Sequence, residues 1–127
     1  MVMLDANIIL RYLLDDNEEM SQKAEEYIKN GDAIVTTEVI AEVVYVLGGV
    51  YDMDKEKIAS TINSFLDLVR HQDKDVVKHA LDTFGSYSLD FVDCVLFSYH
   101  KLRGYDIATF DNKLLKLMEN NSDNSSE

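Results

Sequence analysis

Cysteine, proline and glycine are all scarce in this sequence. Of its 127 residues, one is cysteine, five are glycine and none is proline. A single cysteine excludes an internal disulfide, and because Cys94 stands among apolar neighbours we interpret it as an inert core thiol. With 46% hydrophobic and 28% charged residues, the chain has enough apolar side chain to offset the entropy lost on folding. We therefore expect a folded, helix-rich protein.

Long hydrophobic runs are missing as well. A membrane-spanning helix needs about eighteen or more apolar residues, and no stretch approaches that length. The N-terminus passes from a short apolar run directly to Asp5. We therefore expect no signal peptide and no membrane anchor, and hence a cytoplasmic protein. Because the length is that of one domain, we look for a single functional site.

Basic residues are outnumbered by acidic ones. The chain has 12 lysines and arginines against 24 aspartates and glutamates, which gives a formal net charge of -12. Proteins that bind nucleic acid usually carry the opposite sign, because they neutralise phosphates. Either the target is not nucleic acid, or metal ions neutralise part of the charge.

Short apolar stretches alternate with helical patterns along the chain. The apolar stretches predict strands at residues 1–4, 33–36 and 105–109, with any further strand short and within 70–74. Strands separated by amphipathic helices favour a mostly parallel sheet covered on both faces. We therefore predict an α/β fold with three layers and a central sheet of four or five short strands. A last helix is expected over 112–118, and the polar segment 119–127 is expected to be a disordered tail.

Two acidic residues stand directly behind predicted strands. Asp5 ends the first strand, and Asp111 comes just after the last one. The carboxyl ends of parallel strands share one rim, which is where open α/β sheets bind ligands. We therefore expect these two carboxylates, from opposite ends of the chain, to meet.

Two further acids lie in helices that are expected to begin at the same rim. Glu42 is in the second turn of the helix after the second strand, and Asp93 is in the first turn of the helix that leads to the last strand. Four carboxylates held together repel one another unless a cation neutralises them. Oxygen ligands without a Cys or His pattern suit Mg²⁺ or Mn²⁺, which could activate a water for phosphodiester hydrolysis. Taken singly, each acid is explained equally well as a capping or surface residue.

Four segments of the chain, in order and spacing, resemble the PIN-domain nucleases and in particular the VapC-like toxins of toxin–antitoxin pairs. The segments are LDANI (4–8), AEVVYVL (41–47), LDFVD (89–93) and TFD (109–111). By this resemblance Asp5, Glu42, Asp93 and Asp111 take the metal-binding and catalytic positions, and Asn7 and Thr109 support the acids through hydrogen bonds.

The resemblance covers residues 1–118, which we take as a PIN-like nuclease domain of the α/β/α type. It implies a metal-dependent endoribonuclease that hydrolyses RNA phosphodiester bonds, is inhibited by a cognate antitoxin and frequently forms homodimers. Members of the family often add a final strand after the last helix, whereas this chain ends in a polar segment.

Four residues near the predicted site have two interpretations. Asp90 shares a helix face with Asp93 and can support it, but it can equally cap that helix. Arg11, Lys113 and Lys116 are possible phosphate contacts, although solvated surface explains each of them alone. The three histidines have no ligand spacing and are interpreted as surface residues.

Two other classes of function remain open. A phosphotransfer or receiver-type α/β domain also places acids at such a rim, but its pattern requires a second Asp two residues after the first, where Asn7 stands. A PIN-like module that binds RNA or regulates without catalysis would usually lack one of the four acids, and all four are present.

Overall fold

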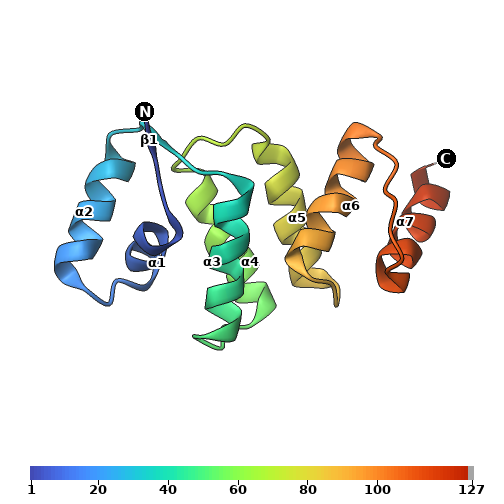
Figure 1. Ribbon diagram of the computed structural model, residues 1–127, viewed down its shortest axis with the longest axis horizontal. Helices are drawn as coiled ribbons and strands as arrows, with labels where there is room; N and C mark the ends of the chain where they lie inside the picture. The colour runs from blue at the N-terminus through green and yellow to red at the C-terminus, as the bar shows by residue number, and fades with distance from the viewer. Residues whose placement is uncertain (126–127) are drawn as a thin grey trace.

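The computed structural model describes residues 1–125 and shows seven helices beside a small parallel sheet (Figure 1). Helices α3 to α7 follow one another along the longest axis of the molecule, and α1 and α2 lie at the end where the sheet is (Figure 1). The α/β class is confirmed. In chain order the elements are β1 (Val2–Met3), α1 (Ala6–Leu14), α2 (Glu18–Lys29), β2 (Ala33–Ile34), α3 (Thr37–Gly49), α4 (Lys55–Leu66), α5 (Lys74–Ser86), α6 (Phe91–Arg103) and α7 (Asn112–Ser125).

Several helices begin where a side chain caps the first turn. Asp5, Asn17 and Asp54 each accept a hydrogen bond from the backbone N–H three residues later, at 2.9, 3.0 and 2.8 Å. Asp111 does the same ahead of α7, at 2.8 Å. Such caps satisfy N–H groups that the helix itself leaves unpaired. Two of the four acids predicted for the site, Asp5 and Asp111, therefore also have a structural role.

The sheet is smaller than the sequence predicted. β1 pairs in parallel with β2, Val2 opposite Ala33 and Met3 opposite Ile34. Arg70 adds a parallel bridge to Ile34 on the other side of β2, so only one residue of the short strand considered within 70–74 is paired. In the part of the chain that the structure describes, the sheet has two strands, and the prediction of four or five is wrong.

The predicted strand at residues 105–109 does not form because contacts with α6 hold its first residue. Gly104 turns the chain at the end of α6 in the left-handed conformation, with φ of 73°. His100 Nδ1 then donates a hydrogen bond to the Tyr105 carbonyl at 2.7 Å, and the Tyr99 and Tyr105 rings stack. The segment therefore connects α6 to α7 at the opposite end of the molecule from β1 (Figure 1).

The core lies mainly where α1, α3, α4 and α5 meet. Its largest fully buried side chains include Ile9 of α1, Leu47 of α3, Phe65 of α4 and Leu81 of α5. Cys94 of α6 is completely buried, and this burial raises the pKa of its thiol to about 12. The thiol therefore stays protonated at neutral pH, as expected for an inert core residue.

The last helix is longer than predicted. α7 runs from Asn112 to Ser125 and so enters the segment for which composition predicted a disordered tail. Residues 126–127 lie outside the described part of the chain. Within the described residues, no helix has the length and apolar character required to cross a membrane.

Candidate active site

Three acidic residues border one small cavity at the junction of α6 and α7. The cavity has a volume of about 310 Å³ and is lined by Asp90, Asp93 and Asp111 together with Ser88, Leu89, Asn112 and Lys113. The first turn of α6 supplies Asp93, and the residue before α7 supplies Asp111. Two of the predicted site residues are therefore brought together, although they are separated in sequence by a whole helix.

Asp93 has the most perturbed environment of these acids. Partial burial raises the pKa of its carboxyl group, and the negative charges of Asp111 and Asp90 raise it further. A cation bound beside this carboxylate would stabilise its ionised form. The electrostatics of the cavity therefore favour a positively charged ligand.

The other residues around the cavity have separate roles. Thr109 Oγ1 accepts a hydrogen bond from the backbone N–H of Asp111 at 3.0 Å, so it orients the backbone of that residue. Asp90 stands at the N-cap position of α6, but its side chain makes no capping hydrogen bond. Its carboxylate is exposed and borders the cavity.

Asp5 and Glu42 lie outside this cavity. Asp5 is the exposed cap of α1, next to the exposed Asn7, and Glu42 is exposed on α3. Helices α1 and α7 lie well apart along the molecule (Figure 1). The expected meeting of all four acids required residues 105–109 to form a strand in the same sheet as β1. Because that strand is absent, its end and the end of β1 do not share a rim.

The predicted phosphate contacts differ in how available they are. Arg11 is engaged, because its guanidinium forms an ion pair with Asp16 at 2.7 Å and donates to the Tyr51 hydroxyl at 3.2 Å. Lys113 borders the acidic cavity. Lys113 and Lys116 together line an adjoining hollow of about 330 Å³. Exposed lysines beside the acids are the basic groups best placed to meet a phosphate.

The carboxylates around the acidic cavity form a small set of ligands for a divalent metal ion. Among the described residues, no group of three or more Asp, Glu, His or Cys side chains is arranged to hold a metal. Mg²⁺ often binds through only one or two carboxylates and keeps several waters. Asp93 and Asp111 fit such a hydrated ion by their chemistry and their shared cavity.

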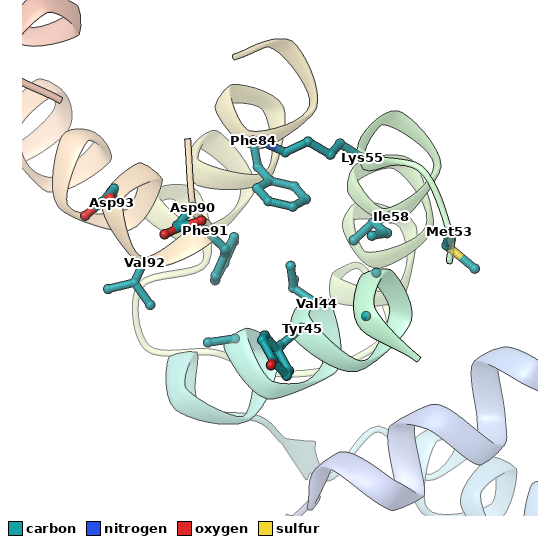
Figure 2. Close-up of a pocket in the computed structure, with 13 residues that line it drawn as sticks. Val44, Tyr45, Met53, Lys55, Ile58, Phe84, Asp90, Phe91, Val92 and Asp93 are labelled. Carbon is teal, nitrogen blue, oxygen red and sulfur yellow. The ribbon is translucent and has the colours of Figure 1, made fainter. Parts of the chain in front are cut away.

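A second and larger cavity lies on the other side of the first turn of α6. It has a volume of about 630 Å³ and is bounded by α3, α4 and the start of α6 (Figure 2). Tyr45, Phe84 and Phe91 contribute aromatic rings to its wall. This cavity was not predicted from the sequence. One residue in the sequence could have indicated it. Tyr45, a large aromatic residue one helical turn after Glu42, is 78% exposed in the structure.

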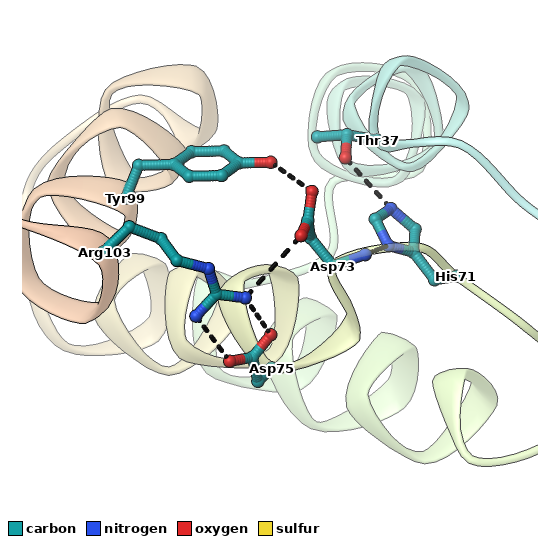
Figure 3. Close-up of polar contacts among 6 residues, drawn as sticks. All are labelled: Thr37, His71, Asp73, Asp75, Tyr99 and Arg103. Carbon is teal, nitrogen blue, oxygen red and sulfur yellow. Dashed lines mark hydrogen bonds and ion pairs between the residues drawn. The ribbon is translucent and has the colours of Figure 1, made fainter. Parts of the chain in front are cut away.

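The far end of α6 is held by a polar network that sequence patterns did not reveal. Arg103 forms a bidentate ion pair with Asp75 at 2.8 and 2.9 Å, and the Tyr99 hydroxyl donates to Asp73 at 2.8 Å (Figure 3). These contacts tie the last turn of α6 to the first turn of α5. They therefore help to fix the helix whose first turn carries Asp93.

Two of the histidines, which were interpreted as surface residues, are partly buried and make side-chain contacts. His71 is partly buried, accepts a hydrogen bond from the Asp73 backbone N–H at 2.8 Å and contacts Thr37 Oγ1 at 2.9 Å (Figure 3). His79 is also partly buried and contacts Ser98 Oγ at 2.7 Å. Burial lowers the pKa of both imidazoles. None of these contacts joins the acidic cavity, so the histidines have structural roles.

Comparison with known proteins gives one match. The family model of the PIN domain matches residues 2–119, which is nearly the whole chain. No curated protein and no solved structure matches the sequence. The matched range includes all four predicted acids and ends just beyond the domain boundary expected at residue 118.

Proposed function

Because the chain belongs to the PIN domain family, whose members are generally nucleases that use divalent metals, we propose that it is a metal-dependent endoribonuclease. Its substrate is RNA, and its reaction is the hydrolysis of a phosphodiester bond by water. The observation that carries the proposal is the cavity that Asp93 and Asp111 line together with Asp90, where partial burial and the charges of the other two acids raise the pKa of Asp93.

Asp93 and Asp111 are the residues of this chain best placed to hold the metal. A bound Mg²⁺ or Mn²⁺ would supply an activated water and neutralise charge on the phosphate. The first turn of α6 positions the carboxylate of Asp93. The capping hydrogen bond from the Leu114 N–H fixes the carboxylate of Asp111 at the start of α7. Lys113 borders the same cavity and is available to contact a phosphate oxygen.

Asp5 and Glu42 are assigned to the proposed site only because the motifs that contain them occur in the expected order. Asp5 lies in the first motif of the chain and Glu42 in the second, as in the family that the chain resembles. Their exposed positions on α1 and α3 favour a second candidate function, an RNA-binding PIN-like module without catalysis. The two candidates differ in whether bound RNA is cut.

We also propose a biological role for this nuclease. The likeness of the four motifs to VapC-like toxins supports a toxin that acts on cellular RNA in the cytoplasm and is inhibited by a cognate antitoxin protein. The same likeness supports a homodimer. Size measurement of the purified protein, alone and after co-expression with the product of an adjacent gene, tests both assemblies.

The nuclease assignment is tested with purified protein and a mixture of RNAs. We expect cleavage with Mg²⁺ or Mn²⁺ that stops on addition of a chelator. Asp93→Asn and Asp111→Asn should lower the rate at least about a hundredfold, because an amide is a poor ligand for a hard cation. Asp106→Asn is the matched control, since it changes an exposed acid in the segment before Asp111.

Three outcomes separate the candidates. Loss of cleavage in Asp5→Asn and Glu42→Gln as well would support a site with four acids. RNA binding without cleavage by the unaltered protein under all metal conditions would favour the non-catalytic module. Full cleavage by a correctly folded Asp93→Asn variant would end the assignment of the acidic cavity as the active site.

A further inference from the structure

The larger cavity, which we call the aromatic hollow, has the shape and chemistry of a site for a flat organic ring. Tyr45, Phe84, Phe91 and Ile58 surround an open space (Figure 2). The Phe84 and Phe91 rings meet edge to face with centroids 6.1 Å apart, which makes a rigid aromatic wall. Its volume of about 630 Å³ is within the range of small-molecule sites.

Two glycines keep the hollow open. Gly48 and Gly49, at the end of α3, present only backbone to it. A Cβ at Gly48 would lie 3.5 Å from Ile58 Cδ1, and a Cβ at Gly49 would meet nothing within 4 Å. Larger side chains at these positions would therefore take up space in or beside the hollow.

The polar groups of the hollow favour a ligand that donates hydrogen bonds. Among the described residues that line it, Lys55 is the single basic one, and its Nζ already donates to the carbonyls of Tyr87 and Leu89 at 3.0 and 2.9 Å. Asp90 is exposed and makes no capping hydrogen bond, so its carboxylate is free to accept. A phosphate is disfavoured here, whereas an amino group on a flat ring is favoured.

The hollow adjoins the acidic cavity. Asp90 and Asp93 line both spaces, so the first turn of α6 is the ridge between them. Asp90 lies beside Phe91 at the edge of the hollow, and Asp93 lies farther along the helix (Figure 2). A polymer that crosses this ridge can place a ring on one side and a phosphate on the other.

We propose that the aromatic hollow binds one base of single-stranded RNA, next to the phosphate group that the proposed metal site at Asp93 and Asp111, with Lys113 beside it, would bind. The base stacks on the exposed ring of Tyr45, and its amino group donates to Asp90. Proteins that read single-stranded RNA commonly use aromatic stacking together with contacts to the edge of the base. Adenine, cytosine and guanine carry such an amino group and uracil does not, so uracil is disfavoured. The inference rests on the proposed nuclease function, which supplies the phosphate site.

Binding is measured with Mg²⁺ present, by fluorescence anisotropy of short labelled RNAs of a single base type that are checked to be intact after the reading. We expect oligoadenylate to bind more tightly than oligouridylate. Tyr45→Ala should weaken oligoadenylate binding about tenfold, because stacking contributes about that factor per base. The matched control is Tyr27→Ala, which removes a half-exposed tyrosine of α2 that lies outside the hollow.

The place of binding is tested separately with mononucleotides. Adenosine monophosphate should shift the NMR signals of the Met53 and Val44 methyl groups, which line the hollow, and ribose 5-phosphate should leave them unchanged. If Tyr45→Ala binds RNA as Tyr27→Ala does, or if ribose 5-phosphate gives the same shifts, the inference is overturned.

The remaining outcomes distinguish this inference from the function on which it rests. If Tyr45→Ala still cleaves RNA with metal and binds RNA as before, the nuclease function is supported and the base-binding site is contradicted. A protein that neither binds nor cuts RNA would remove both. A change in oligomeric state on Tyr45→Ala, with RNA binding intact, would assign the hollow to a second copy of the chain and so overturn the inference.

Discussion

At the scale of single residues, the acids of the proposed site combine chemistry with helix capping. Asp111 accepts a hydrogen bond from the Leu114 N–H, and Asp5 accepts one from the Ile8 N–H. An alanine substitution at either position would therefore lower stability and activity together. Only a substitution that keeps the cap can separate the two roles.

We predict that Asp111→Asn keeps the stability of the protein but loses its nuclease activity. Asparagine caps a helix about as well as aspartate, whereas alanine at a capping position costs about 1 kcal/mol. The free energy of unfolding from urea titration should therefore fall for Asp111→Ala and change little for Asp111→Asn, while both variants lose cleavage. Equal activity in Asp111→Asn and the unaltered protein would leave Asp111 with the capping role alone.

The same pair of substitutions at Asp5 tests whether this residue takes part in catalysis. If Asp5 only caps α1, Asp5→Asn should retain both stability and cleavage. Loss of cleavage with stability retained would assign Asp5 to the site, as the order of the motifs suggests. Paired measurements of unfolding and of RNA cleavage on one preparation separate these results.

At the scale of elements, α6 carries a residue of the proposed site at one end and is anchored to α5 at the other. Its first turn carries Asp93 and its last turn is tied to α5 through Arg103 and Tyr99 (Figure 3). His71 lies in the connection that leads into α5, where its Nδ1 accepts from the Asp73 N–H. That bond requires an unprotonated Nδ1, so the proton of the neutral imidazole is on Nε2 and is donated to Thr37.

We predict that acidification weakens this connection. Burial lowers the pKa of His71 below its ordinary value of about 6.5, although the nearby charges of Asp73 and Glu38 oppose the shift. Because the folded protein then binds the proton less tightly than the unfolded chain, the stability contributed by His71 is present above about pH 6.5 and is lost as the pH falls below it. Thermal unfolding followed from about pH 8 to about pH 5 should show a larger loss in the unaltered protein than in His71→Asn. The same slope in both would contradict the assignment to His71.

Elements were predicted unevenly from the sequence. The last helix was predicted to begin at residue 112 and does begin there, because a helix start depends on a local cap and apolar spacing among neighbours in the chain. The strand expected at 105–109 has the apolar content of a strand, but a strand needs a partner. Here the His100 side chain binds the carbonyl of Tyr105, and within residues 1–125 no strand pairs with this segment.

At the scale of the whole molecule, the net charge of -12 sets the conditions for binding RNA. Repulsion between an acidic protein and phosphate is reduced by bound cations and by salt. The acidic cavity is the proposed place for one such cation, and its ligands come from α6 and from the start of α7. Metal binding should therefore stabilise the docking of these two helices.

We predict that Mg²⁺ raises the thermal unfolding temperature through this cavity. A ligand that binds only the folded state stabilises it according to its concentration relative to its dissociation constant, by about 2.7 kcal/mol at a hundredfold excess. The shift should shrink in Asp93→Asn and Asp111→Asn and persist in Asp106→Asn, as read by calorimetry with and without chelator. A shift of equal size in all four proteins would mean that the metal acts by general screening of the acidic surface.

The sequence by itself determined the helical content, the inert buried cysteine and the membership of the PIN domain family, because each depends on composition or on patterns local in the chain. It also singled out Asp93 and Asp111, which lie around one cavity. Tertiary structure alone decided that the sheet stops at two strands and that Asp5 and Glu42 stand outside that cavity. The aromatic hollow also depends on the tertiary structure. Its walls come from helices far apart in sequence, and such a space exists only once those helices have packed.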